Sequence, residues 1–211
     1  MPRYVEALAR EIEFYGQRNQ DAVKTIYFGG GTPSLLAPDQ FGRLFKAVHD
    51  HFELLPGTEI TIEANPGRLS AGLLGAVKSL GVNRISLGVQ SSNPNELRAL
   101  DRLHGYPEAV EAVAAARKAG FDNLSMDLIF GIPQQTMDTW DQSIEDVLAL
   151  QPEHLSLYSL TVEEGTPLAG KVSTGQVSVP EDDLAAEMFE LAEERPVSYT
   201  HLRAHETKAN L

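Results

Sequence analysis

The feature that most constrains this 211-residue chain is a regular alternation of short β-rich runs with amphipathic helical patterns. The predicted strands are residues 25–28, 59–62, 84–89, 123–130 and 154–158. Apolar residues recur at helical spacing in the stretches between and before them, at residues 4–15, 40–52, 73–80, 107–119 and 139–150. Strands joined by helices of this length pair in parallel through crossover connections. The alternation therefore predicts an α/β protein with a parallel sheet.

Residues at the ends of the helical patterns support these boundaries. Pro38 and Asp39 are suited to open the second helix, and Ser70 is a suitable N-cap for the third. Gly81 and Gly120 follow two of the helices at the position that favours a left-handed backbone. We expect all three helices to begin or end at these residues.

Polar residues at successive strand ends favour a (β/α) barrel over an open sheet. Residues 29–32 follow the first strand, Glu63 the second and Gln90 the third. Asp127 lies within the fourth strand, and residues 159–161 follow the fifth. A barrel builds one site from many such loops, whereas an open sheet concentrates its ligand residues at one switch point. We expect a TIM-like barrel that is incomplete at this length, with an open doubly wound sheet as the alternative because loops are polar in any fold.

The run Gly29-Gly30-Gly31-Thr32-Pro33 directly follows the first predicted strand. Glycines without a Cβ let the backbone come within hydrogen-bonding distance of a ligand. The run has neither the Gly-Lys-Ser/Thr ending of a phosphate-binding P-loop nor the spacing of a dinucleotide fingerprint. It indicates a ligand held by main-chain groups; the alternative is a tight turn with no ligand.

Four further side chains are candidates for binding. Glu63 can accept from ribose hydroxyls or pair with a cation, although a strand-end glutamate also serves as a cap. Gln90 can donate and accept, as reading a nucleoside requires, and Arg102 can bind a carboxylate or remain a solvated surface residue. Asp127 lies in a strongly apolar strand, where it needs a partner, so a structural and a ligand-binding role both stay open.

Charge and composition exclude several classes of protein. The formal net charge is −13, which argues against a nucleic-acid partner. The chain has no cysteine, so it has no disulfide and no thiolate-bound metal. The histidines before residue 196 show no metal-ligand spacing, and only His104 is expected near a site. No apolar run reaches the roughly 18 residues of a membrane span and no signal peptide is evident, which favours a cytoplasmic protein.

Four motifs in order carry a resemblance to a known family: residues 28–36, 63–67, 83–91 and 127–133. Together they resemble the radical S-adenosylmethionine (SAM) family that contains the oxygen-independent coproporphyrinogen III oxidases and the HemW-type heme chaperones. Within that family, residues 31–36, 63–67, 102–105 and 160–163 are more similar to the chaperone branch. The resemblance assigns the SAM-binding positions to Gly30, Gly31, Thr32, Glu63, Gln90, Arg102, Asp127 and Thr161.

The resemblance also implies parts that this chain lacks. Family members hold a [4Fe–4S] cluster through cysteines spaced CxxxCxxC, on a loop after the first barrel strand. With no cysteine present, we expect that the first strand and the cluster loop are missing. Residues 1–195 are accordingly expected to be a partial radical SAM core domain without the family's C-terminal domain. Residues 196–211 bear no likeness to the family and are expected to be a non-native tail translated from a sequencing-library adapter, with an ordinary polar tail as the alternative.

Three functional hypotheses follow. The first is a heme-binding carrier that hands heme or a porphyrin precursor to an unidentified acceptor protein. The second is an enzyme that converts coproporphyrinogen III to protoporphyrinogen IX by oxidative decarboxylation. The third is that the chain is a fragment with no activity of its own, whose parent protein has one of these functions. The motifs at residues 34–36 and 102–105 favour the carrier.

Overall fold

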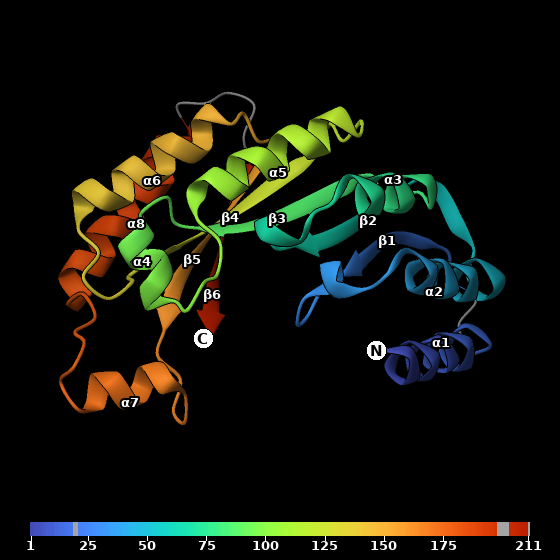
Figure 1. Ribbon diagram of the computed structural model, residues 1–211, viewed down its shortest axis with the longest axis horizontal. Helices are drawn as coiled ribbons and strands as arrows, with labels where there is room; N and C mark the ends of the chain where they lie inside the picture. Colours follow the sequence, from blue (N-terminus) through green and yellow to red (C-terminus); the bar gives the residue numbers. More distant parts are fainter. Residues whose placement is uncertain (19–20, 198–202, 211) are drawn as a thin grey trace.

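A computed structural model describes residues 1–18, 21–197 and 203–210, whose strands and helices alternate as the sequence predicts (Figure 1). The strands are β1 (Val23–Phe28), β2 (Leu54–Ala64), β3 (Arg84–Gln90), β4 (Leu124–Phe130), β5 (His154–Thr161) and β6 (Arg203–Asn210). The helices are α1 (Pro2–Gly16), α2 (Pro38–His51), α3 (Ala71–Ser79), α4 (Pro94–Ala99), α5 (Tyr106–Lys118), α6 (Met137–Ala149), α7 (Pro167–Ser173) and α8 (Asp182–Val197). Short 3-10 turns follow β1 and β2, as η1 (Pro33–Leu35) and η2 (Pro66–Arg68).

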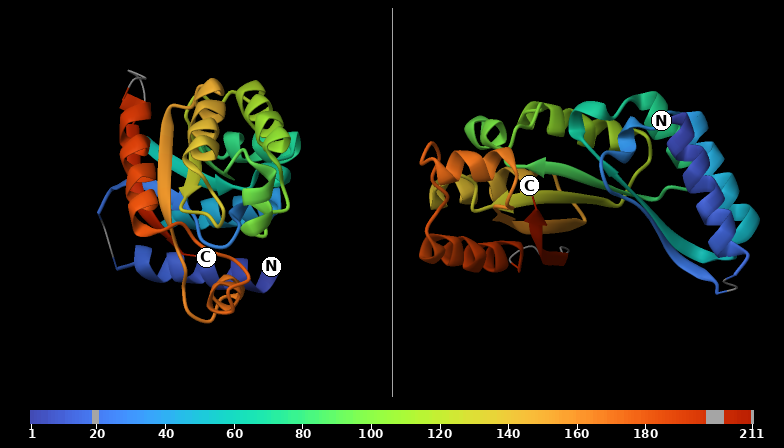
Figure 2. Two further views of the ribbon diagram at one scale, coloured as in Figure 1. Left: turned by 90° about the vertical axis from the view of Figure 1, so that its left-hand side faces the viewer. Right: turned by 90° about the horizontal axis from the view of Figure 1, so that it is seen from below.

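The sheet is parallel throughout, and its strands lie in chain order from β1 to β6. Each crossover therefore adds the next strand on the same side, and the strand order never reverses as it does in a doubly wound sheet. The strip curls into an arc, and α8, α6, α5, α3, α2 and α1 follow one another along its outside (Figures 1 and 2). The predicted α/β fold, a partial TIM-like barrel, is confirmed, and the open-sheet alternative is wrong.

The predicted elements and caps agree with the structure. Every predicted strand and helix is present, with ends that differ by at most a few residues except in β2, which begins at Leu54. The Ser70 hydroxyl accepts from the backbone N–H of Leu73 at 3.2 Å, which caps α3. Gly81 and Gly120 have φ angles of +103° and +86°, as expected after α3 and α5. The short helices α4 and α7, the longer α8 and the strand β6, which lies in the expected tail, were not predicted.

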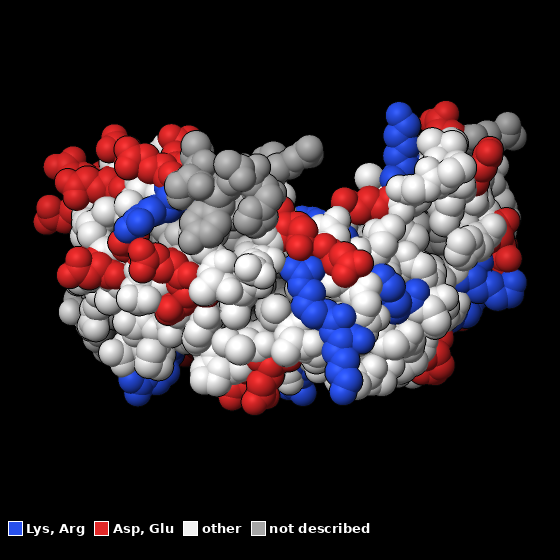
Figure 3. Space-filling view, turned by 90° about the horizontal axis from the view of Figure 1, so that it is seen from above, with Lys and Arg blue, Asp and Glu red and all other residues white. Residues whose placement is uncertain are grey.

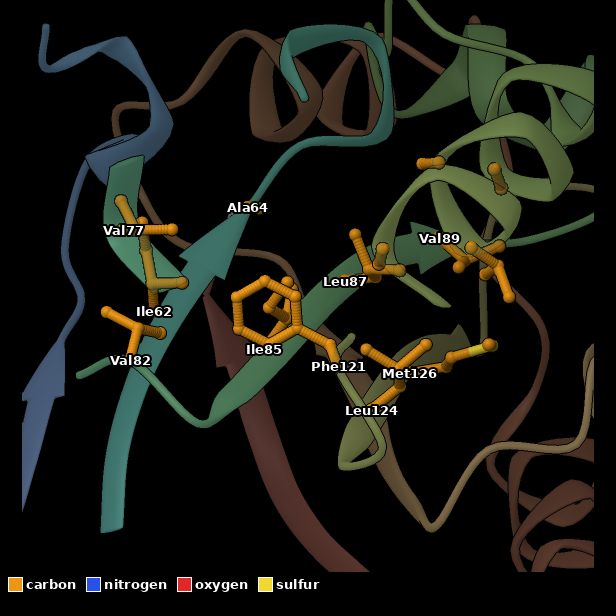
Figure 4. Close-up of a cluster of buried hydrophobic side chains, with 14 of the residues drawn as sticks. Ile62, Ala64, Val77, Val82, Ile85, Leu87, Val89, Phe121, Leu124 and Met126 are labelled. Carbon is orange, nitrogen blue, oxygen red and sulfur yellow. The ribbon is translucent and has the colours of Figure 1, made fainter. Parts of the chain in front are cut away.

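The core lies between the sheet and the helices outside it. Alternate residues of β3, Ile85, Leu87 and Val89, are fully buried against the helices, together with neighbours on β2, β4 and α3 (Figure 4). Because side chains alternate across a strand, Ser86, Gly88 and Gln90 face the opposite, inner side of the arc. The apolar core and the polar inner face are therefore built from the same strands.

Helix α8 covers the end of the arc by packing on α6. The buried Trp140 indole donates to the carbonyl oxygen of Met188 at 2.9 Å, and Arg195 pairs with Asp141. Acidic side chains gather over α6 and α8 at one end of the face shown in Figure 3, where much of the negative charge is concentrated. No helix in the described part of the chain is long and apolar enough to cross a membrane.

Candidate functional site

A pocket of about 250 Å³ lies where β1 to β5 end. Every one of these strands, or the loop that follows it, contributes to its wall, as expected of a barrel-type site. The lining residues are Gly31, Thr32, Pro33, Glu63, Ala64, Asn65, Ser86, Gly88, Gln90, Arg102, Asp127, Ile129 and Tyr158.

The pocket brings together six of the eight predicted site residues. These are Gly31, Thr32, Glu63, Gln90, Arg102 and Asp127. Gly30 adjoins them, because its backbone N–H donates to Glu63 Oε2 at 3.2 Å. Thr161 is the last residue of β5 and is not among the residues that line the pocket.

The glycine turn needs its glycines for two different reasons. Gly30 and Gly31 have φ angles of +80° and +62°, which disfavour a side chain, and a Cβ built on either would meet no atom of the described residues within 4 Å. A Cβ on Gly29 would lie 2.7 Å from the Tyr27 ring. The backbone of Gly30 and Gly31 thus borders open space that a ligand can enter.

Glu63 is held in place by the turn and by β1. Tyr27 donates its hydroxyl proton to Glu63 Oε1 at 2.9 Å, while the N–H of Gly30 reaches Oε2. Burial and, next, this hydrogen bond raise the pKa of Tyr27, so the phenol remains a donor. The Glu63 carboxylate is therefore oriented before any ligand arrives.

Asp127 has the partner that its apolar strand requires, and the partner is neutral. The Ser86 hydroxyl lies 3.0 Å from Oδ1 and 3.2 Å from Oδ2. Burial, with a smaller contribution from the negative charge of Glu63, raises the pKa of Asp127 to about 6. A cation entering the pocket would oppose this shift, because a neighbouring positive charge favours the ionised carboxylate.

Gln90 and Arg102 present polar atoms that have no hydrogen-bond partner in the described part of the chain. Gln90 has a left-handed backbone, with φ +71°, and its buried Oε1 has no hydrogen-bond partner among the described residues. The buried Nε of Arg102 is likewise without one, and burial lowers the pKa of its guanidinium. Asn65 Oδ1 is a third such atom on the wall. Unsatisfied buried groups are costly, so these three atoms point to a bound ligand or water.

Gly88 makes room for the Gln90 amide. A Cβ on Gly88 would lie 2.8 Å from Gln90 Nε2. The pairing of β3 with β4 also shifts register between these two residues, which turns the end of β3 toward the pocket.

His104 lies near the site but behind its wall. The side chain is buried, and its Nε2 lies 3.3 Å from the carbonyl oxygen of Val89, next to Gln90. Burial, the largest cause, lowers its pKa. His104 therefore braces the end of β3 and does not line the pocket.

Sequence reasoning did not single out Asn65, Ser86, Ile129 or Tyr158 as site residues. Strand periodicity could have predicted three of them. Ser86 lies four residues before Gln90, Ile129 lies two residues after Asp127, and Tyr158 lies on the inner face of β5. Residues two or four apart on a strand share a face. Asn65 carried a weaker signal, as the residue before a proline at a strand end.

The pocket separates charges of opposite sign. Two carboxylates, those of Glu63 and Asp127, stand on β2 and β4, whereas the Arg102 guanidinium has no ion-pair partner within the described residues. Amide groups of Asn65 and Gln90 lie on the same wall. The arrangement suits a ligand that carries a carboxylate, a cationic group and polar ring or hydroxyl atoms.

Residues 2–147 match the Radical SAM superfamily. The chain is 37% identical over 194 residues to the heme chaperone HemW of Mycobacterium tuberculosis, covering 92% of this chain and 50% of that protein. It is 40% identical to the mitochondrial radical S-adenosyl methionine domain-containing protein 1 of Mus musculus, covering 80% of this chain and 38% of that one. Among solved structures it is similar to the coproporphyrinogen III oxidase HemN of Escherichia coli, with a TM-score of 0.78, 26% identity, and coverage of 94% of this chain and 45% of HemN.

The chain spans about half the length of the bacterial HemW relatives that it matches. The family match covers most of the chain, and the structural match extends over nearly all of it. The strand-end pocket lies where the motifs that carried the resemblance converge. The chain belongs to the radical SAM superfamily, in its HemW/HemN-like group.

Proposed function

We propose that this chain is the SAM-binding part of a HemW-like heme chaperone, with residues 1–195 contributing part of the radical SAM core. The observation that carries the proposal is that one pocket holds two carboxylates and the Arg102 guanidinium, which has no ion-pair partner among the described residues. SAM has the matching groups: a carboxylate, a cationic amine and sulfonium, and a nucleoside.

Each part of SAM has a complementary group in the pocket. Arg102 would bind its carboxylate, which is the strong charge-assisted pairing of a guanidinium. Glu63 would accept from the ribose hydroxyls or the amine, and Asp127 would favour the positive charge. Gln90 would read the nucleoside, against the open backbone of Gly30, Gly31 and Thr32. Thr161, at the end of β5, stays a proposed contact of the same ligand.

The iron–sulfur cluster does not fit this chain, because a [4Fe–4S] cluster is held by cysteine thiolates and the sequence has none. When both are bound, the cluster and SAM supply radical chemistry in this superfamily. We assign no step of that chemistry to the residues present here. Their proposed work is to bind and orient SAM.

Heme is the proposed cargo, and the names of the HemW relatives support it. In this proposal the protein is cytoplasmic and transfers heme to an acceptor protein. The alternative, oxidation of coproporphyrinogen III, is supported by structural likeness to HemN at lower sequence identity. The complete gene product, reconstituted anaerobically with its cluster, separates the two: stoichiometric heme binding without turnover supports the chaperone, whereas turnover of coproporphyrinogen contradicts it.

Titration of the 211-residue chain with SAM in a calorimeter tests the binding proposal. Arg102→Leu should weaken binding by about 10- to 100-fold, because hydrogen bonds to charged groups contribute roughly 1.5–3 kcal/mol. Arg98→Leu is the matched control, since Arg98 is exposed on α4 and does not line the pocket. Equal affinities for the two variants would overturn the assignment of Arg102.

A further inference from the structure

A buried carboxylate outside the pocket connects several parts of its wall. Glu96, on α4, is 3% exposed. Its Oε2 accepts from the Ser91 hydroxyl at 2.6 Å and from Gln135 Nε2 at 3.0 Å, while Oε1 has no hydrogen-bond partner within the described residues. No lysine or arginine in the described part of the chain forms an ion pair with it.

Such a group needs an explanation beyond packing. Burying a carboxylate without a cation is costly, and a well-packed apolar side chain in the same place is commonly no less stable. A carboxylate oxygen can, however, accept more than one hydrogen bond and so tie separate segments to one point. Each segment that Glu96 joins lies next in the chain to a residue group that lines the pocket.

The first attachment fixes Gln90. Ser91 follows Gln90 directly, and its hydroxyl also accepts from the backbone N–H of Asn93 at 2.9 Å. The left-handed backbone of Gln90 is unfavourable for a side chain and persists only where the surroundings determine it. Glu96 holds Ser91 on one side of Gln90, and His104 holds the carbonyl of Val89 on the other.

The second attachment fixes Arg102. Helix α4 has six residues and ends shortly before Arg102. The backbone N–H of Arg102 donates to the carbonyl oxygen of Leu97 at 2.9 Å, and Leu97 follows Glu96 in the sequence. Leu97 is itself buried. The position of Arg102 therefore follows the position of α4, which Glu96 anchors from within.

The third attachment reaches β4. Gln135, in the loop that follows β4, donates to Glu96 and accepts from the backbone N–H of Ile132 at 3.2 Å. This loop directly follows β4, the strand from which Ile129 lines the pocket. One carboxylate thus joins the ends of β3 and β4 through α4.

We infer that Glu96 is a positioning residue that sets Gln90 and Arg102 at the spacing their shared ligand requires. Glu96 does not line the pocket, so it acts through these two residues and not by contact. The part of the inference that concerns ligand affinity rests on the proposed binding of SAM. The part that concerns the segment from Ser91 to Arg102 does not.

Two substitutions of Glu96 separate positioning from packing. In Glu96→Gln the amide oxygen can still accept from both Ser91 and Gln135, so affinity for SAM should stay within about twofold of the unmodified chain. Glu96→Leu has a similar volume and removes the one acceptor that Ser91 and Gln135 share, so affinity should fall tenfold or more. Ser91→Ala leaves the carboxylate in place but removes the Ser91 hydroxyl, with its contacts to Glu96 and to the Asn93 N–H, and should give an intermediate loss of affinity. This variant replaces Glu96→Leu in the test if Glu96→Leu does not fold.

Val77→Ala is the control for general destabilisation, because Val77 is buried on α3 and belongs to the core away from Glu96. Affinities are measured by calorimetry with SAM, at a temperature where unfolding shows each variant fully folded. The inference is overturned if Glu96→Leu loses no more affinity than Val77→Ala, or if Glu96→Gln loses as much as Glu96→Leu.

Amide hydrogen exchange without ligand keeps the test independent of the proposed function. Backbone amides from Ser91 to Arg102 should exchange at least tenfold faster in Glu96→Leu than in Val77→Ala, and near the unmodified rate in Glu96→Gln. If the unmodified chain fails to bind SAM, the proposed function is wrong and exchange decides the inference about Glu96. Equal exchange in Glu96→Leu and Val77→Ala overturns it.

Discussion

Replacing Asp127 with asparagine is expected to stabilise the folded chain increasingly as the pH rises from 5 to 8. The carboxyl is partly buried among apolar neighbours on β4, with the Ser86 hydroxyl as its near partner and Glu63 adding negative charge. Asparagine keeps an oxygen that accepts from Ser86 and carries no charge. The substitution therefore removes the cost of ionisation and keeps the hydrogen bond.

The sign and size of the effect follow from the pKa of Asp127, which is about 6 in the folded chain against an ordinary 3.8. Below pH 3.8 both states hold the proton. Between 3.8 and 6 the unfolded chain ionises while the folded chain does not, so stability falls as the pH rises, and above 6 the loss is complete. At 1.36 kcal/mol for each pH unit the full loss is about 3 kcal/mol, of which about 1.4 kcal/mol falls between pH 5 and 8. Solvent contact makes these figures upper bounds.

Urea unfolding at several pH values between 5 and 8 measures the effect. Trp140, the single tryptophan and fully buried, reports unfolding by its fluorescence. The free energy of unfolding of Asp127→Asn, minus that of the unmodified chain, should increase by up to about 1.4 kcal/mol across this range. Asp122→Asn removes the same charge at an exposed position before β4 and serves as the control. A difference for Asp127→Asn that does not vary with pH would refute the reasoning.

Three further outcomes are expected. SAM should bind on the order of tenfold more tightly at pH 7 than at pH 5, because the ionised Asp127 carboxylate attracts its cationic groups; calorimetry showing the same affinity at both values contradicts this. Gly88→Ala should displace the Gln90 amide and weaken SAM binding about fivefold, with little change in the free energy of unfolding. Gly30→Ala should lower the free energy of unfolding by about 1 kcal/mol through backbone strain. Denaturant unfolding in which Gly88→Ala is the less stable of the two variants contradicts the geometry. Trp140→Phe should lower the free energy of unfolding by about 1–3 kcal/mol, because it loses volume and its hydrogen bond to α8, and an unchanged melting temperature in circular dichroism would contradict this.

The sheet could be predicted from the sequence because the strand and helix patterns are local and repeat along the chain. Alternating and helical spacing is visible within each segment, and the caps at Ser70, Gly81 and Gly120 mark where helices begin and end. Helix α4 was missed because six residues hold too few turns to show a period. Its start did carry a signal, because the Asn93 side chain accepts from the backbone N–H of Asn95 and Pro94 follows as the first helical residue.

The candidate site was predictable in its residues and less so in its electrostatics. Polar groups at strand ends identified Glu63, Gln90 and Asp127, since strand ends of a parallel sheet converge. That Asp127 is paired with a serine and not with Arg102 depends on strand register, which the sequence does not fix. Glu96 depends on contacts with Ser91 and Gln135, and the second of these is 39 residues away.

The inner face of the arc is more polar than the interior of an ordinary TIM-like barrel. Parallel strands are ordinarily apolar on both faces, and the interior of a TIM-like barrel is filled by branched apolar side chains. Here the inner positions below the pocket are polar and joined: Ser125 Oγ lies 2.9 Å from His154 Nδ1 and 3.4 Å from Ser156 Oγ, while Arg84 donates to Thr61 Oγ1 at 3.4 Å. Burial of such polar groups contributes little to stability, so the helix-facing apolar core supplies most of it. The strands themselves therefore carry part of the site, because Ser86, Asp127 and Tyr158 line the pocket from within β3, β4 and β5.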